Sequence, residues 1–208
     1  MTSRERIAAA CAHTEPDRLP VDFGGGFQTG IHVSIVYKLR QALGLGPPGA
    51  PVKVVEPYQM LGLIEDDLQR ALDLDVEGVF GVETMFGFRN EDWTPFRLDD
   101  GTEILVSRHF QAAKDKNGDT LVFPKGDRTA PPSGRMPKDG FFFDAIIRQP
   151  PLDEAALDPD ENCEEFGPIS ERDLAYFEAE TRRAAATGRG VMATFGGTAL
   201  GDIALVPA

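Results

Sequence analysis

Several residues that could do chemistry lie beside two glycine-rich segments of this sequence. The first segment reads VDFGGGFQTGIHV, where an aspartate precedes three glycines and a histidine follows them. The second reads FGG and spans residues 195–197. Glycine lets backbone approach a ligand closely or adopt positive φ, so both segments are candidates for ligand contact. The residues expected to bind substrate are Asp22, Gly24, Gly25, Gly26, Thr29, Phe195, Gly196 and Gly197.

Three other residues carry groups suited to proton transfer. His32 follows the first glycine segment, and Asp75 and Glu83 flank a β-branched run. Carboxylates and imidazoles at the mouth of an α/β fold can act as general acids and bases, so we expect Asp75, Glu83 and His32 to be catalytic. For His32, binding a ligand and capping the next helix remain equally open. No metal site is expected, because Cys11 and His13 are only two ligands and nothing nearby completes a set.

Neither glycine segment matches a phosphate-binding motif. A dinucleotide fingerprint starting at Gly24 needs a sixth-position glycine, and this position holds Thr29. In the second segment, Asp202 occupies the place where a P-loop requires lysine. A tight turn after a strand is therefore the alternative interpretation of both segments.

The composition restricts the partners of the protein. The chain has 208 residues and a net charge of -13, which gives no electrostatic footprint for nucleic acid or an anionic membrane. Its two cysteines do not make a disulfide framework. No stretch approaches the ~18 apolar residues of a membrane span. We therefore expect a cytoplasmic protein with no nucleic acid or membrane partner. The glycine segments indicate a small-molecule substrate as its ligand.

Helical and strand patterns alternate along the first part of the chain. Apolar spacing and capping residues predict helices, and β-branched runs predict strands between them. The alternation favours a parallel sheet covered by helices. The predicted elements are a helix opened by the Thr2–Glu5 capping box, a strand at 21–23, a helix at 31–43, a strand at 51–57, a helix at 61–72 and a strand at 74–82.

The pattern changes after the third predicted strand. Asp100-Gly101 and Asn117-Gly118 each separate two strand-like runs, which indicates hairpin turns. Residues 94–143 therefore form an expected antiparallel β-hairpin insertion within one domain that spans 1–208. A helix opened by Ser170 follows it, and then GRGVMATFGG, residues 188–197, which is expected to form a strand that ends at its glycine pair.

Four segments resemble those of uroporphyrinogen decarboxylase family proteins, in the same order. They read MTSRERIAAACAHTEPDRLPVDFGG, TGIHVSIVYKLRQALGL, VVEPYQMLGLIEDDLQRALDLDVEGV and VMATFGG. The family fold is a (β/α)8 TIM barrel with its site at the carboxyl ends of the strands. The resemblance therefore implies an α/β fold that is a partial (β/α)8 barrel, its N-terminal half, incomplete at the C-terminus.

The resemblance also implies a reaction class. The family contains uroporphyrinogen decarboxylases and corrinoid-dependent methyltransferases. True decarboxylases carry an arginine-rich segment after the first strand that clamps propionates, and this sequence reads FGGGFQTGIHV there. The departure favours methyl transfer between a corrinoid and a thiol or methylated small molecule. Decarboxylation in porphyrin biosynthesis is one alternative, and a truncated, non-catalytic half-barrel or one subunit of a split barrel is another.

Cofactors and partners follow from the same resemblance. The methyltransferase branch in full length uses zinc, which lowers the pKa of a thiol acceptor, together with a corrinoid held on a partner protein. No zinc ligand of that branch can be carried over to this sequence. An unclosed parallel sheet would expose an apolar edge, so we expect a homo-oligomer or pairing with the missing C-terminal half.

Overall fold

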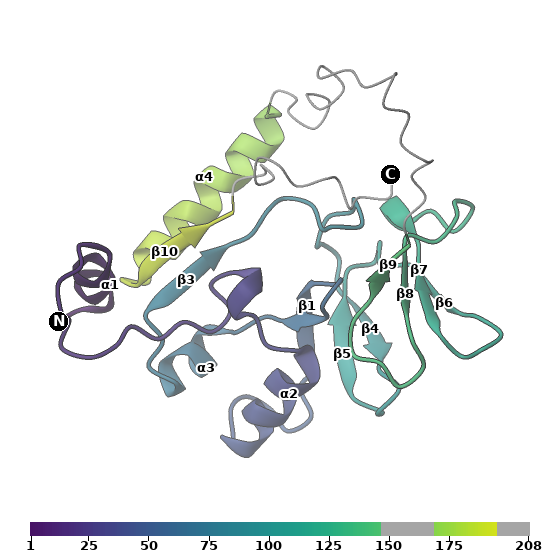
Figure 1. Cartoon of the computed structure of the whole chain (residues 1–208), viewed down its shortest axis with the longest axis horizontal. Helices are drawn as coiled ribbons and strands as arrows, with labels where there is room; N and C mark the ends of the chain where they lie inside the picture. Colours follow the sequence, from purple (N-terminus) through teal and green to yellow (C-terminus); the bar gives the residue numbers. More distant parts are fainter. Residues whose placement is uncertain (147–168, 195–208) are drawn as a thin grey trace.

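A computed structural model gives the fold, and it describes residues 1–146 and 169–194 (Figure 1). The described elements form a mixed α/β fold with several sheets and no closed barrel among them. The helices are α1 (Ser3–Cys11), η1 (Phe27–Thr29), α2 (Val33–Ala42), α3 (Asp66–Ala71), η2 (Pro124–Gly126) and α4 (Glu171–Ala186). The strands are β1 (Val52–Glu56), β2 (Leu61–Gly62), β3 (Val76–Val79), β4 (Thr94–Arg97), β5 (Glu103–Val106), β6 (Ala112–Lys114), β7 (Thr120–Val122), β8 (Gly134–Met136), β9 (Asp144–Ala145) and β10 (Gly190–Ala193).

The strands β3 and β10 form a parallel pair that α4 covers (Figure 1). Val76 lies opposite Gly190, and Val79 lies opposite Ala193. Phe177 of α4 packs against Val79 in a small core of its own. This β3–α4–β10 unit joins a strand, a helix and a parallel strand. The successive strands predicted at 51–57 and 74–82, which are β1 and β3, do not pair and lie in different sheets.

The start of α4 confirms its predicted cap. The Asp173 amide donates a 3.1 Å hydrogen bond to the Ser170 hydroxyl oxygen. The first helix begins in the same way, because the Glu5 amide donates to Thr2 Oγ1 at 3.2 Å and the Glu5 carboxylate accepts from the Thr2 amide at 2.8 Å. Both caps satisfy amides that have no partner inside the helix.

The other parallel pair lies in a four-stranded sheet of order β2-β1-β5-β4. β1 runs parallel to β5 and antiparallel to β2, and β4 and β5 form a hairpin. Gly101 has φ +85° in the turn of this hairpin, and Gly118 has φ +88° in the turn between β6 and β7. These values confirm both predicted hairpin turns. β5 also makes the predicted insertion continuous with the sheet that contains β1.

The main core lies where α2, β1 and β5 meet the antiparallel sheet β6-β7-β8-β9. Val33, Val36 and Ile104 have no exposed surface there. The last of three consecutive phenylalanines, Phe143, is also fully buried, and its ring packs edge-on against Phe86 at 5.7 Å between centroids. This packing fixes the position of β1, which carries part of the site.

Two predicted elements differ from the structure. Residues 21–23 are not a strand; Val21 instead exchanges hydrogen bonds with Asp75, whose amide donates to the Val21 carbonyl at 2.8 Å. The helix predicted at 61–72 begins only at Asp66, because Leu61 and Gly62 pair with β1 as β2. Pairing with β1 therefore outweighs the helical spacing of the apolar residues at this point. None of the helices described combines the length and apolar character needed to cross a membrane.

Candidate functional site

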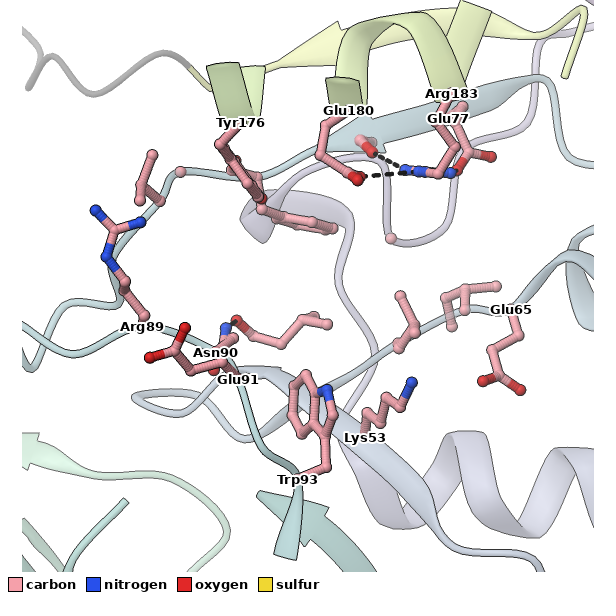
Figure 2. Close-up of a pocket in the computed structure, with 18 of the residues that line it drawn as sticks. Lys53, Glu65, Glu77, Arg89, Asn90, Glu91, Trp93, Tyr176, Glu180 and Arg183 are labelled. Carbon is pink, nitrogen blue, oxygen red and sulfur yellow. Dashed lines mark hydrogen bonds and ion pairs between the residues drawn. The ribbon is translucent and has the colours of Figure 1, made fainter. Parts of the chain in front are cut away.

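A cavity of about 590 Å³ lies between α4 with β3 and β1 with the segment 89–93 (Figure 2). It follows β3 from Glu77 past the carboxyl end of the strand to residues 80–82. Figure 2 shows Tyr176 and Glu180 on one side, and Lys53 and Trp93 on the opposite side. The carboxyl end of a parallel strand is where α/β folds place their ligands.

The β1 side of the cavity is built by strand alternation. Val52 and Val54 are buried in the main core, whereas Lys53 and Val55 line the cavity. Successive side chains of a strand point to opposite faces, so core packing of the valines directs Lys53 into the cavity. Its ammonium lies 5.5 Å from the centroid of the Trp93 ring.

Ion pairs hold most of the charged groups around the cavity. Arg183 donates to Glu77 at 2.6 Å and to Glu180 at 2.8 Å. Further pairs join Arg89 to Asp173 at 2.5 Å, Arg172 to Glu91 at 3.4 Å and Arg40 to Glu65 at 3.1 Å. Lys53 has no ion-pair partner within 1–146 and 169–194.

Two polar side chains of the wall have defined protonation or orientation. Burial, and next the charge of Glu180, raises the pKa of Tyr176, whose hydroxyl donates to the Phe80 carbonyl at 3.3 Å. Gln69 is only 7% exposed, and its Nε2 donates to the Ile64 carbonyl at 3.1 Å. Since a carbonyl can only accept, this bond fixes the amide orientation. The buried Oε1 of Gln69 then has no donor among the residues described.

The glycine segment contacts the protein itself. Asp22 accepts from the Gly25 amide at 2.9 Å and from the Thr29 hydroxyl at 2.8 Å, which closes the segment into a compact turn. A Cβ on Gly25 would lie 2.5 Å from Val76 Cγ1, and one on Gly78 would lie 2.8 Å from the Gly25 carbonyl oxygen. The glycines thus allow this turn to pack against β3.

The cavity includes a small part of the predicted substrate-binding set. Gly24 lines it, with φ +82°. Asp22, Gly25, Gly26 and Thr29 do not line it and belong to the turn against β3. Phe195, Gly196 and Gly197 lie outside the described residues.

His32 is the N-cap of α2, as one of its two open interpretations predicts. The Ser34 amide donates to His32 Nδ1 at 3.2 Å, and the ring meets Phe141 edge-on at 5.7 Å between centroids. Burial lowers the pKa of His32, so the neutral imidazole that accepts this bond is favoured. His32 borders a second, smaller cavity of about 190 Å³, together with Met136 and Phe141.

Asp75 lies at the amino end of β3, away from the strand end that borders the main cavity. It is fully buried, and it accepts from Arg6 at 2.5 Å and from Arg18 at 2.7 Å. Burial alone would raise the pKa of Asp75, but hydrogen bonds from the Val21 amide and both guanidiniums outweigh it and lower the pKa.

The third predicted catalytic residue also stands apart. Glu83 is exposed in the segment after β3, where it forms an isolated bridge with Arg89. Neither Asp75 nor Glu83 lines either cavity, and His32 borders only the smaller one. The structure therefore does not bring the three predicted catalytic residues together at one site.

Sequence reasoning missed Lys53, Gln69 and Trp93 as site residues. One signal was available for Lys53, because it is the only cation in the otherwise apolar run PVKVV. Trp93 is the single tryptophan of the chain, but it lies outside any recognised motif. Gln69 gave no signal, because a glutamine on the polar side of a predicted helix is ordinary.

The cofactor implied by the resemblance finds no ligand set in this part of the protein. Within 1–146 and 169–194, no three His, Cys, Asp or Glu side chains come together as metal ligands. The described residues thus do not fit the zinc of the methyltransferase branch. No profile of a protein family, no curated protein and no solved structure matches this chain.

Proposed function

We propose that the main cavity binds the substrate of a small-molecule enzyme, and that the chain belongs with the uroporphyrinogen decarboxylase superfamily on its methyltransferase side. The observation that carries the proposal is the cavity of about 590 Å³ at the carboxyl end of β3. Its volume falls in the range of small-molecule sites, roughly 300–1,000 Å³. The methyltransferase assignment rests on the four sequence segments that resemble the superfamily.

The charges of the cavity support a compact substrate over a tetrapyrrole. A macrocycle with many carboxylates needs several free cations to bind it. Arg89, Arg172 and Arg183 line the cavity, but each is already paired with a carboxylate of the protein. Among the described residues that line the cavity, only Lys53 is left to meet an anion. Methyl transfer to a small thiol therefore suits the site better than decarboxylation of uroporphyrinogen.

The finer architecture that we propose is part of a (β/α)8 barrel in the cytoplasm. The β3–α4–β10 unit supports it, because such barrels repeat strand, helix and parallel strand. β10 pairs only with β3 among the described strands, and Val191 and Met192 are 39% and 42% exposed. We propose that a further strand, from a second copy or from the remainder of a barrel, covers this edge.

The test is methyl transfer from methylcobalamin to 2-mercaptoethanol by the purified chain. The sulfur–carbon bond forms as the cobalt–carbon bond breaks, the bonding pair stays on cobalt to give cob(I)alamin, and the thiol proton passes to solvent. The product is a thioether that mass spectrometry quantifies. Gly81 lines the cavity, and a Cβ there would lie 3.6 Å from its nearest neighbour. Gly81→Leu should therefore fill the cavity without a backbone clash. Ala186→Leu adds the same bulk at an exposed position of α4.

We expect the Gly81→Leu variant to form thioether at least about tenfold more slowly, because misplacing a substrate by ~1 Å can cost about 100-fold. The Ala186→Leu variant should keep the unmodified rate. Absence of thioether above the rate without protein would overturn the methyltransferase proposal. Equal rates for both variants would show instead that the reaction takes place outside this cavity.

A further inference from the structure

Two ion pairs join the walls of the main cavity at one end. Arg89 pairs with Asp173 at 2.5 Å, and their side chains are only 21% and 26% exposed. Arg172 pairs with Glu91 at 3.4 Å, and both of these side chains are more exposed. Figure 2 shows Arg89 and Glu91 at the end of the cavity away from Arg183. Each pair therefore runs from α4 to the opposite wall.

The segment on that opposite wall is fixed to the main core. Asn90 Nδ2 donates to the Val55 carbonyl of β1 at 2.6 Å, and the Ser107 hydroxyl donates to the Arg89 carbonyl at 2.6 Å. Phe88, directly before the segment, is only 4% exposed within the core. These contacts fix the backbone from which the Arg89 side chain extends.

The first turn of α4, on the other wall, has little apolar packing. Leu174 is 55% exposed, and Ile169, just before the helix, is 61% exposed. The first buried side chain of the helix is Phe177, which lies further along in the small core with Val79. A segment with few buried apolar contacts opens at a low cost in free energy. The two ion pairs therefore supply much of what holds this turn against the opposite wall.

We propose that the first turn of α4, residues 170–174, is a gate at this end of the main cavity, and that the two ion pairs hold it closed. Opening breaks both pairs and moves the turn off the opposite wall, while the buried second half of α4 stays on β3. The Arg89–Asp173 pair contributes more to closure, because it is shielded more from water and salt. The inference goes beyond the proposed reaction, since it concerns access to the cavity and is tested without a substrate.

Hydrogen exchange of the Leu174 amide, followed by NMR, tests the gate. In the closed turn this amide donates to the Ser170 carbonyl at 2.9 Å. Arg89→Gln removes the shielded ion pair from the fixed wall and leaves the sequence of α4 unchanged. Arg97→Gln is the matched control, because Arg97 pairs with Glu103 and both side chains are more than half exposed. We expect exchange to be about fivefold faster in Arg89→Gln and to change less than about 1.5-fold in the control.

Salt provides a second measurement on the same amide. At 1 M salt the Debye length is about 3 Å, so an ion pair that is open to solvent part of the time is weakened. Exchange at Leu174 should therefore become faster with salt in the unmodified protein. In Arg89→Gln the increase should be clearly smaller, because the main ion pair is already absent.

Access to the cavity is measured with a thiol inside it. Gly81→Cys places this thiol in the cavity wall, where a Cβ lies 3.6 Å from its nearest neighbour. The two natural cysteines, Cys11 and Cys163, are replaced by serine in this background. Labelling with uncharged N-ethylmaleimide should become faster with Arg89→Gln by about the same factor as exchange at Leu174. Loss of a nearby positive charge alone disfavours the thiolate and would slow labelling, so an increase reports access.

An exchange rate at Leu174 that is the same in Arg89→Gln and in the unmodified protein would overturn the inference. Faster exchange without faster labelling would overturn it too, because the turn would then open without giving access to the cavity. Circular dichroism shows that each variant is folded, and Val82→Cys, at the next position of the wall, replaces Gly81→Cys if that variant does not fold. The thioether assay decides the proposed function independently of either result.

Discussion

Two groups of polar residues flank the two ends of β3. They differ in whether their charged side chains have partners of opposite charge. At the amino end, Asp75 is fully buried and both of its oxygens accept hydrogen bonds, from Arg6 and Arg18. Toward the carboxyl end, the cavity leaves the Lys53 ammonium without a counter-ion among the described residues. All hydrogen-bonding oxygens of Asp75 at the amino end of β3 therefore have partners, whereas the cavity toward the carboxyl end contains a charge without one.

The difference separates a structural role from a binding role. A buried charge whose partners are all present restrains the chain, and here it ties α1 and the segment before the glycine turn to β3. A polar atom left unsatisfied costs stability, and folds tolerate it where a ligand supplies the partner. The comparison predicts that substitutions at the amino end change stability and that substitutions in the cavity change binding.

The largest effect is expected for Asp75→Asn. The substitution removes the buried charge that pairs with both Arg6 and Arg18, and it leaves Arg6 only its ion pair with the partly exposed Asp17, so the free energy of unfolding should fall by about 3 kcal/mol at pH 7. Urea unfolding measures it. Because the folded pKa of Asp75 lies below its ordinary value of 3.8, this contribution is complete above that pH. It is lost as the pH falls through the folded pKa, so the two proteins should converge in acid.

Asp73→Asn is the matched control for that experiment. Asp73 also pairs with Arg18, at 2.6 Å, but its side chain is 82% exposed. An exposed ion pair is worth about 0–1 kcal/mol, so the control should change the free energy of unfolding by no more than this. If Asp75→Asn were as mild as the control, the amino-end cluster would not be a structural clamp, and the contrast with the cavity would disappear.

A smaller effect is expected for Gly78→Ala, which tests the packing of the glycine turn. The new Cβ would lie 2.8 Å from the carbonyl oxygen of Gly25, and backbone cannot move aside as a side chain can. We expect a loss of about 1–3 kcal/mol of unfolding free energy, as for other overpacked positions. Gly81→Ala places a Cβ no closer than 3.6 Å to any neighbour and should be neutral or slightly stabilising. Thermal unfolding measures both variants, and Gly78→Ala should unfold at the lower temperature. If Gly81→Ala unfolded first, the packing role of Gly78 would be contradicted.

Local signals of the sequence predicted the elements that depend on neighbouring residues. The caps at Thr2 and Ser170, and the turns at Gly101 and Gly118, were predicted correctly, since a cap or turn requires a residue type at a fixed offset. The segment 21–23 was predicted as a strand and is not one, because its partner is the side chain and amide of Asp75, more than fifty residues away.

The candidate site was less predictable than the fold. A glycine that makes room for a ligand and a glycine that makes room for a neighbouring strand look the same in the sequence. The sequence around Gly25 therefore could not show that its neighbour is Val76 of β3. The cavity joins Lys53, Gln69 and Trp93, which come from a strand, a helix and a connecting segment. Their meeting depends on tertiary packing, which periodicity within one element does not report.

The smallest stability effect, and the sharpest test of the comparison, is expected for Lys53→Met. The variant loses a cation–π contact worth about 0.5–1 kcal/mol, and it removes an unpaired charge from a half-buried position, so the two changes should largely cancel. Urea unfolding should therefore place it within about 1 kcal/mol of the unmodified chain. Asp75→Asn should instead lower stability, as argued above. If the free energy of unfolding of Lys53→Met fell by several kcal/mol, the ammonium would have a structural partner. The charges of the cavity would then all be paired, as those of the Asp75 cluster are.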